Sequence, residues 1–293
     1  MFDSLQRQCT AMSDGPEAQS ISVTGTSGIP KVNFRAGLTP KAAQVHLISA
    51  GQGPTFTGNQ YATFEIEAVD GQTVKSFPTS SGVVTNFDGT NPITAELKEN
   101  QSSEVNLCDA LTGFRVGSRV AAVFPLKPAT ASAKVNSVVL IVDLKGIFLP
   151  HATGSNQPAA SGVPVAVHVA SGEPGLTFPS NQAAPAEFKQ YTSIKGAGEV
   201  LKTGDHIKVH YKLFLWDSTH TMVEKSWGNA PFDTYVGKGN ITGFSKALLG
   251  QTIGSQVVAV IPPDLAYGAN PPAGSSIPAN ATLVFVIDIL GKY

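Results

Sequence analysis

The sequence predicts an α+β protein in which one fold occurs twice along the chain. Residues 110–125 (ALTGFRVGSRVAAVFP) and 247–262 (ALLGQTIGSQVVAVIP) are identical at nine of sixteen positions, and residues 138–146 similarly match residues 283–291. A repeat of about 145 residues is much longer than a solenoid unit and indicates a duplicated domain. Each copy shows the period-2 alternation of strands around one short helical pattern, and 29 glycines and 20 prolines supply many turns.

Length and charge exclude several classes of protein. A chain of 293 residues is expected to form two domains, and its 42% of hydrophobic residues suffice for two cores. The 20 basic and 21 acidic residues give a net charge of -1, so we expect no nucleic-acid partner. No apolar run approaches the roughly 18 residues that span a bilayer, and we expect no transmembrane segment.

The same patterns divide the chain into four segments. Residues 1–19 are polar and without periodicity, so they are expected to form a tail or tether. Residues 20–148 form the first copy of the fold, and residues 163–293 form the second copy. Between them, residues 149–162 include the small and polar run HATGSNQPAASG, which is typical of a flexible linker.

The helix expected in each copy has one apolar face. In the second copy, Phe244, Ala247 and Leu248 lie at positions i, i+3 and i+4, and Gly250 ends the helix. The matching residues of the first copy are Leu107, Ala110 and Leu111. One short helix beside many short strands is the reason for placing the protein in the α+β class.

Five motifs of the second copy occur in the order that a known family has. They are Val209-His210-Tyr211, Gly237 followed by Ile241-Thr242-Gly243-Phe244, Val257 to Pro262, Ala266-Tyr267-Gly268, and Ile277-Pro278 through Phe285. In these motifs the chain resembles the FKBP-type peptidyl-prolyl cis-trans isomerases, in the tandem form of exported, lipoprotein-like bacterial members. The resemblance implies that each copy is an antiparallel β-sheet wrapped over one short α-helix.

The resemblance also implies an enzyme that rotates X-Pro peptide bonds and assists the folding of exported proteins. Amide resonance sets the barrier of roughly 18–20 kcal/mol, and the twisted bond has a less polar carbonyl, which a dry apolar pocket favours. Prolyl bonds are suitable substrates because their cis form is populated and exchanges slowly. The expected ligands are proline-containing polypeptides and the macrolide inhibitors of the family. No cofactor is expected.

The family's pocket carries over to ten positions of the second copy. The expected catalytic residues are Tyr211, Phe232, Ile241, Phe244, Tyr267 and Phe285. The expected substrate-binding residues are Val223, Glu224, Ala266 and Ile277. Val223-Glu224 stands where the family usually has Phe-Asp, and Phe244 stands where it usually has tryptophan. These departures predict a pocket that is shallower or more open on one side.

Each of these residues also has a simpler interpretation. Tyr211 and Phe285 are suited to be plain core residues, and Glu224 is suited to be a solvated carboxylate in a turn. The six histidines show no pairing with serine or cysteine that indicates a catalytic triad, and no cluster has the spacing of metal ligands. If the departures from the family's pocket have abolished turnover, the alternative function is a non-catalytic FKBP-like chaperone or peptide-binding module.

The first copy keeps the framework of the repeat and lacks the pocket motifs. Residues 126–137 contain neither Ala-Tyr-Gly nor Ile-Pro, Leu140 stands at the position of Phe285, and Leu107 replaces the aromatic floor. Phe64 is the candidate for the position of the first-strand tyrosine. These changes preserve a core and remove a site, so the first copy is expected to be a degenerate FKBP-like domain without catalytic activity.

The two cysteines, Cys9 and Cys108, are expected to form a disulfide. Cys108 takes the position of Ser245, which is off the apolar helix face, and Cys9 lies in a tail that is otherwise unanchored. A disulfide needs an oxidising compartment. We therefore expect an extracytoplasmic protein, membrane-tethered through a lipoprotein leader that has been removed. The alternative is a cytoplasmic protein with two reduced cysteines.

Overall fold

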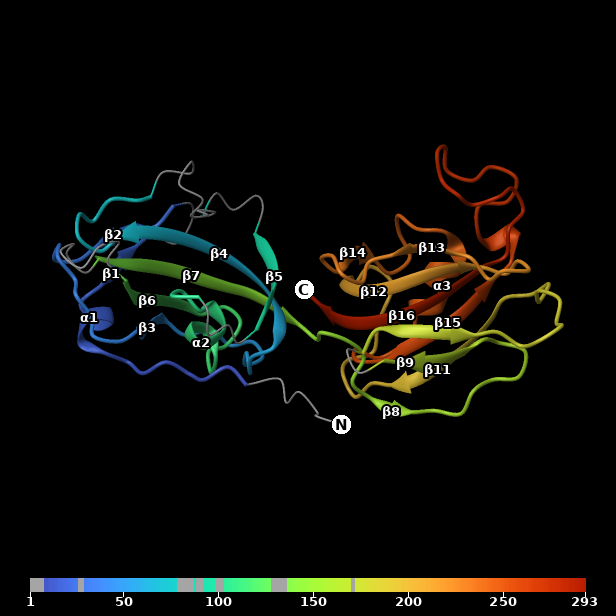
Figure 1. The fold of residues 1–293 in the computed structure, drawn as a ribbon, viewed down its shortest axis with the longest axis horizontal. Helices are drawn as coiled ribbons and strands as arrows, with labels where there is room; N and C mark the ends of the chain where they lie inside the picture. Colours follow the sequence, from blue (N-terminus) through green and yellow to red (C-terminus); the bar gives the residue numbers. More distant parts are fainter. Residues whose placement is uncertain are drawn as a thin grey trace. The chain divides into compact units, whose positions relative to one another are not determined.

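The computed structural model describes residues 8–25, 29–77, 87, 92–98, 103–127, 136–169 and 172–293. The chain divides into two compact units, Met1–Ile147 and Phe148–Tyr293 (Figure 1). We call them the N-terminal unit and the C-terminal unit. Within the described ranges, no helix is both long enough and apolar enough to cross a membrane.

The N-terminal unit is built on a five-stranded sheet with the strand order β3-β6-β7-β4-β5. The strands are β3 (Gln44–Ser49), β4 (Gln60–Asp70), β5 (Ile93–Leu97), β6 (Arg119–Leu126) and β7 (Asn136–Phe148). The remaining elements are α1 (Pro16–Gln19), β1 (Ser22–Thr24), β2 (Lys31–Asn33) and α2 (Leu107–Leu111). The β3–β6, β6–β7 and β4–β5 pairs are antiparallel.

Each face of this sheet has its own core, because successive side chains of a strand point to opposite faces. On one face, Phe64, Phe124 and Leu140 pack with the apolar side of α2. On the other face, Ile141 packs with Phe34 and the residues around α1. Two buried faces explain why β6 and β7 are apolar at nearly every position.

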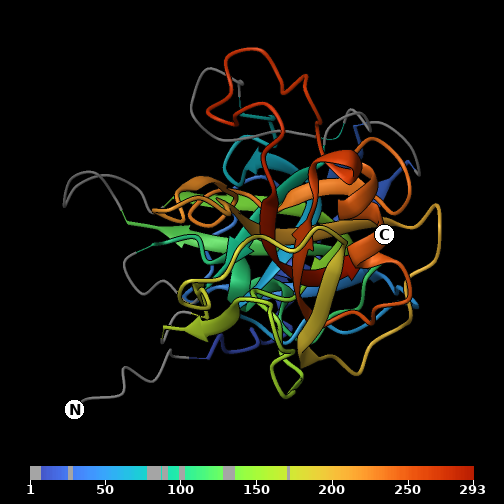
Figure 2. The same cartoon turned by 90° about the vertical axis from the view of Figure 1, so that its right-hand side faces the viewer.

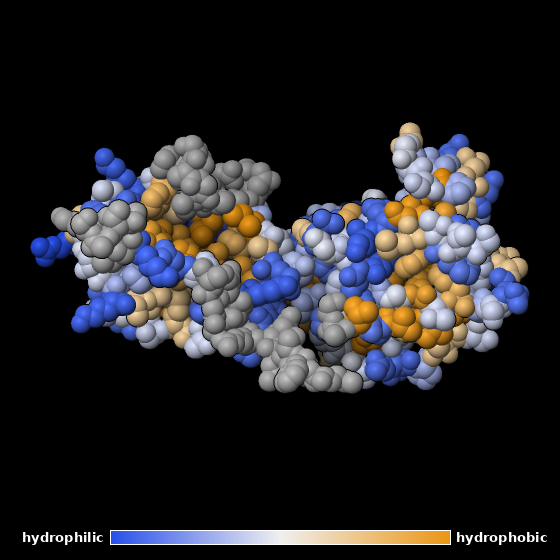
Figure 3. All heavy atoms as spheres, viewed as in Figure 1, coloured by the Kyte–Doolittle hydropathy of each residue, from blue (hydrophilic) through white to orange (hydrophobic). Residues whose placement is uncertain are grey.

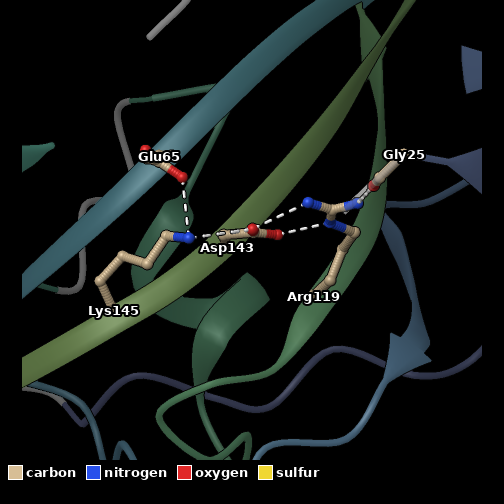
Figure 4. A network of polar contacts seen from close by, with 5 residues as sticks. All are labelled: Gly25, Glu65, Arg119, Asp143 and Lys145. Carbon is tan, nitrogen blue, oxygen red and sulfur yellow. Dashed lines mark hydrogen bonds and ion pairs between the residues drawn. The ribbon is translucent and has the colours of Figure 1, made fainter. Parts of the chain in front are cut away.

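A network of charged side chains lies on the second face of the N-terminal sheet (Figure 4). Arg119 of β6 donates from Nε and an Nη atom to both carboxylate oxygens of Asp143 on β7, at 2.6 and 2.9 Å, and donates to the Gly25 carbonyl at 2.6 Å. Lys145 bridges the Glu65 carboxylate at 2.8 Å and the Asp143 carboxylate at 3.2 Å. The β6–β7 pair is thereby held by a bidentate ion pair, which is the strong form of a charged hydrogen bond.

The C-terminal unit is built on a seven-stranded sheet. The strand order is β13-β12-β16-β15-β11-β8, and β14 also pairs with β12. The strands are β8 (Ser155–Asn156), β11 (Lys189–Lys195), β12 (His206–Leu215), β13 (Met222–Lys225), β14 (Phe232–Tyr235), β15 (Gln256–Ile261) and β16 (Leu283–Lys292). A separate hairpin joins β9 (Val165–His168) to β10 (Pro174–Thr177).

One helix, α3 (Thr242–Leu248), packs on the sheet of the C-terminal unit through Phe244, Ala247 and Leu248. Gly243 faces Ile261 of β15 so closely that a Cβ atom would overlap with the Ile261 side chain. After β15 comes a 3₁₀ turn, η2 (Pro263–Leu265), and the segment between η2 and β16 projects from the unit in both ribbon views (red in Figures 1 and 2). The glycine permits the close approach of helix and strand that the pocket needs.

The two sheets share their strand order and a register. Read from one edge, β3-β6-β7-β4-β5 corresponds to β11-β15-β16-β12-β13, and each unit has its helix before β6 or β15. Ala122 lies opposite Leu140 in the β6–β7 pair, and Ala259 lies opposite Phe285 in the β15–β16 pair. These are the positions that the internal repeat aligns.

The segment 149–162 does not behave as the flexible linker that its composition suggested. The Leu149 N–H donates to the Leu290 carbonyl, the Ala152 N–H donates to the Asp288 carboxylate at 2.8 Å, and β8 pairs with β11. Small polar residues allow the backbone to lie close to the sheet, where its hydrogen-bonding groups find partners. The prediction of a linker was wrong, because these residues are part of the C-terminal unit.

The expectation of a tail at residues 1–19 was also wrong for its described part. Residues 16–19 form α1, in which Ala18 is buried, and the Val45 N–H donates to the Ser13 carbonyl. The structure joins Cys9 and Cys108 in a disulfide, the pair that the sequence analysis selected. The expectation that Cys108 points away from the core was wrong, because Cys108 of α2 is only 1% exposed and its side chain lies in the core.

Some apolar side chains remain at the surface. Val165 and Val167 of β9 and the following Val169 are exposed, and Figure 3 shows hydrophobic residues at the surface of both units. Isolated apolar residues at the surface are normal for folded proteins. The buried clusters on the faces of the two sheets, and not these exposed residues, hold the folds together.

Candidate functional site

A pocket of about 520 Å³ opens on the side of the C-terminal sheet that packs against α3. Its size lies in the range of small-molecule and peptide side-chain sites. The residues that line it are Tyr211, Leu213, Glu224, Phe232, Gly239, Asn240, Ile241, Phe244, Tyr267 and Phe285. Five of its walls come from β12, β13, β14, α3 and β16, so the site depends on the assembled unit.

Five aromatic residues line the pocket, and the rings of four of them contact one another. Tyr211 of β12 and Phe285 of β16 lie with their ring centroids 5.9 Å apart, and the Phe244 ring of α3 lies 5.2 Å from that of Phe285 at 73°. The Phe232 ring is 5.5 Å from that of Tyr211. Phe232 is 37% exposed and so lies at the mouth, whereas the other three side chains are buried. Edge-to-face contacts of this kind hold the rings in fixed positions.

The central strands position Tyr211 and Phe285 by their register. Tyr211 lies opposite Ile287 and Leu213 lies opposite Phe285 in the β12–β16 pair. Because side chains two residues apart share a face, all four project to the inner side of the sheet. The floor of the pocket is thus fixed by two neighbouring strands in the middle of the sheet.

Polar groups are few and remain uncharged except for one carboxylate. The Tyr211 hydroxyl donates to Glu224 Oε1 at 2.6 Å. Burial raises the pKa of Tyr211, and the hydrogen bond to Glu224 and its charge raise it further. Burial and then the charge of Glu224 also raise the pKa of Tyr267. Both hydroxyls therefore stay protonated at neutral pH, and the Tyr267 hydroxyl is a donor at the pocket wall.

Ile241 precedes α3 in an extended conformation, with φ -58° and ψ 148°. Its carbonyl accepts from Phe244 and Ser245, which begins the helix. In the part of the chain that the structure describes, no group accepts a hydrogen bond from the Ile241 N–H. An N–H at a helix start is a ready donor for a ligand carbonyl.

The structure brings most of the expected site residues together. All six expected catalytic residues and Glu224 line the pocket. The other three expected substrate-binding residues do not line it: Ile277 belongs to the core cluster that also holds Tyr211, Phe244 and Phe285, and Val223 and Ala266 pack against this cluster. The absence of Val223 from the lining fits the substitution of a family phenylalanine by a smaller side chain.

Three lining residues were missed by the sequence analysis: Leu213, Gly239 and Asn240. Leu213 follows Tyr211 by two residues, and the period of a strand would have placed it on the same face. Gly239 and Asn240 lie in the turn before Ile241, and the Asn240 amide donates to Thr234 and to the Lys238 carbonyl. No periodic pattern indicates a turn residue, so that signal was absent.

The corresponding residues of the N-terminal unit are buried in a core. Phe64 and Leu140 are each 3% exposed and pack in the cluster around α2. The prediction that residues 126–137 lack the pocket motifs falls largely on residues 128–135, which lie outside the described residues. Among the residues that are described, no group of three His, Cys, Asp or Glu side chains could hold a metal ion.

An apolar pocket with few polar groups is typical of sites that enclose an apolar ligand and orient it with a few hydrogen bonds. Residues 198–290 match the family model of the FKBP-type peptidyl-prolyl cis-trans isomerases. FK506-binding protein 1A of Neurospora crassa is 38% identical over 117 residues, which cover 40% of this chain and 93% of that protein. The chain belongs to the FKBP family of peptidyl-prolyl cis-trans isomerases.

Other relatives share only part of their length with this chain. FK506-binding protein 2B of Rhizopus delemar is 38% identical over 96 residues, which cover 31% of this chain and 46% of that protein. The chain is also similar to the crystal structure of FkpA from Escherichia coli, at 32% identity and a TM-score of 0.32, over 36% of this chain and 47% of that chain. The matched segment is confined to the C-terminal unit, which holds the pocket.

Proposed function

We propose that the C-terminal unit catalyses the cis–trans isomerisation of X-Pro bonds in proline-containing polypeptides. The observation that carries this proposal is the closed set of aromatic rings from Tyr211, Phe244 and Phe285 on the pocket floor. These three rings form an apolar surface against which the pyrrolidine ring of proline can pack. The family membership supports the same activity.

The chemistry requires no covalent intermediate. With the proline ring against the aromatic floor, the N–H of Ile241 and the hydroxyl of Tyr267 are placed to hold carbonyl oxygens of the peptide. A twisted amide has lost its resonance and has a less polar carbonyl, so removal of water lowers the cost of the twist relative to the planar ground state. The pocket then accelerates rotation by orientation and desolvation alone.

Val223 is the observation that favours a second candidate function. The family usually has phenylalanine at this position, and Val223 does not line the pocket, so one aromatic wall is missing and the desolvation on which turnover depends is weaker. The protein would then be a non-catalytic FKBP-like chaperone or peptide-binding module. Peptide binding without rate acceleration is the property that separates this function from the enzyme.

The N-terminal unit is proposed to be a degenerate tandem copy of the same fold. Its shared strand order and the shared register of Ala122–Leu140 with Ala259–Phe285 support this proposal. In the same proposal, the protein assists the folding of exported proteins and is extracytoplasmic, tethered through a removed lipoprotein leader. The disulfide supports an oxidising compartment. Macrolide inhibitors of the family are proposed to bind the C-terminal pocket.

The test is an isomerisation assay on a proline tetrapeptide with the full chain. Exchange NMR measures cis–trans rotation without a coupling protease, and catalytic amounts of the protein should accelerate it. A macrolide inhibitor should abolish the acceleration in proportion to its occupancy. Binding of the peptide without any acceleration would favour the chaperone or peptide-binding module instead.

A further inference from the structure

We propose that Glu224 makes this site prefer proline peptides with a basic residue before proline over those with an acidic residue there. The inference rests on the proposed function, because it concerns the substrate class of the same pocket. Three observations support it. The Glu224 carboxylate has no ion-pair partner in the described part of the chain, the register of β12 and β13 turns the neighbouring lysines away from the pocket, and the charge of Glu224 affects a tyrosine on another wall of the pocket.

Glu224 is the one charged residue among those that line the pocket. Its Oε1 atom accepts a hydrogen bond from the Tyr211 hydroxyl at 2.6 Å, and a neutral donor stabilises a carboxylate without cancelling its charge. No lysine, arginine or histidine of the described segments forms an ion pair with it. The negative charge is therefore left for a ligand to neutralise.

The register of β12 and β13 explains why neighbouring lysines do not provide that neutralisation. Leu213 lies opposite Glu224 on the pocket side of this pair, and Lys212 lies opposite Lys225 on the other side. On that outer side, both ammonium groups bind the Glu173 carboxylate, at 2.7 Å from Lys212 and 3.2 Å from Lys225. The positive charges nearest in sequence thus face away from the pocket.

The charge of Glu224 acts on the two tyrosine hydroxyls of the pocket, those of Tyr211 and Tyr267. After burial, it is the cause that raises the pKa of Tyr267, whose hydroxyl comes from the segment after η2. A cavity of about 520 Å³ also has room for more than a proline ring. In this proposal the proline ring lies against Phe244 and Phe285, and the residue before proline lies toward the wall that holds Glu224. Glu224 is exposed, so solvent and salt screen a charge–charge interaction with a ligand there and keep its effect modest.

The experiment compares four tetrapeptides that differ only in the residue before proline: lysine, its uncharged isostere norleucine, glutamine and glutamate. With the full chain, we expect kcat/KM for the lysine peptide to exceed that for the glutamate peptide about tenfold, the effect of one or two partly exposed charge pairs. The ratio should shrink with added salt, because ions screen such pairs. Glu224→Gln keeps an acceptor for Tyr211 and should bring the ratio close to one.

A matched control removes an equal charge elsewhere. Glu199→Gln, whose carboxylate is exposed and pairs with Lys292, should leave the lysine-to-glutamate ratio unchanged. Equal rates for the two peptides with the unaltered chain would overturn the inference while leaving the proposed function intact. If no peptide is isomerised, the proposed function fails, and the same ratio measured as binding affinity decides the inference: equal affinities would overturn it.

Discussion

The two units place the same acidic residue at the same cross-strand position and surround it differently. In the N-terminal unit Asp143 lies opposite Arg119, which binds both of its oxygens. In the C-terminal unit Asp288 lies opposite Gln256, whose amide donates to one carboxylate oxygen at 2.7 Å, and the Ala152 N–H donates to the other. One carboxylate is compensated by a cation, and the other is held by neutral donors.

The two units therefore keep the same strand register but differ in the side chains that surround the aspartate. Asp143 forms ion pairs with Arg119 and Lys145 in the network of Figure 4. Asp288 has no such ion pair among the described residues, and burial raises its pKa to about 6. The inner face of the sheets differs in the same way: Leu140 fills a core where Phe285 forms a pocket wall. The framework of the fold therefore does not depend on the site, and the two can be perturbed separately.

The largest expected effect is on Phe285 and its counterpart. Phe285→Ala and Leu140→Ala should each lower the free energy of unfolding of their own unit, by about 3–5 and 2–5 kcal/mol, because each leaves a cavity. Only Phe285→Ala should abolish isomerisation. Both tryptophans lie in the C-terminal unit, so their fluorescence in a urea titration follows that unit alone. Loss of isomerisation with Leu140→Ala, at temperatures where the C-terminal unit stays folded, would contradict the comparison.

The second effect is on the disulfide. Replacing both Cys9 and Cys108 by serine should lower the stability of the N-terminal unit by about 2–5 kcal/mol, because a loop closed over a sequence separation of 99 residues is released. The C-terminal unit should unfold at the same urea concentration as before. Far-UV circular dichroism with tryptophan fluorescence separates the two transitions. A shift of the tryptophan transition would argue against independent units.

The third effect concerns pH. The ordinary pKa of an aspartate is 3.8, so a folded-state pKa of about 6 means that the folded chain binds the Asp288 proton more tightly than the unfolded chain. This contribution to stability is present below about pH 4 and is lost as the pH rises to 6, by about 3 kcal/mol. The Asp288→Asn variant has no titrating carboxyl group here, so it should not lose this stability as the pH rises. The unfolding free energy of the variant minus that of the unaltered chain should thus rise by this amount between pH 4 and 7.

His210 lies directly opposite Asp288 on β12 and acts in the other direction. Burial lowers its pKa from 6.5 to about 4, so its contribution is absent at pH 4 and is gained as the pH rises to 6.5. In the unaltered chain the two contributions offset each other, and the pair leaves little net dependence on pH. A constant difference between Asp288→Asn and the unaltered chain over this range would refute the assignment of a raised pKa.

The smallest expected effect is on Tyr267. Tyr267→Phe removes one hydrogen bond worth about 0.5–1.5 kcal/mol and keeps the ring, so kcat/KM should fall about two- to tenfold. The fall should be far smaller than that of Phe285→Ala, measured by exchange NMR on the same peptide. Equal losses would show that the pocket acts through its hydroxyl more than through its aromatic walls.

Much of the fold and pocket could be predicted because the information is periodic or repeated. The internal repeat aligned Leu140 with Phe285, and the register of both hairpins agrees with that alignment. The composition of residues 149–162 wrongly predicted a flexible linker. These residues are held by backbone hydrogen bonds to the sheet, which do not depend on the polarity of the side chains. Cys108 misled for another reason: the position is buried by residues distant in sequence, which a helix-face argument does not include.

β16, the last strand of the C-terminal unit along the chain, lies in the middle of its sheet between β12 and β15. Until it is placed, the two strands on either side of it have no common partner, and the pocket lacks its Phe285 wall. Folding of this unit must therefore wait for contacts between segments far apart in sequence, which is the feature that slows β-rich domains. The pocket of this unit is therefore completed only when β16 joins the sheet.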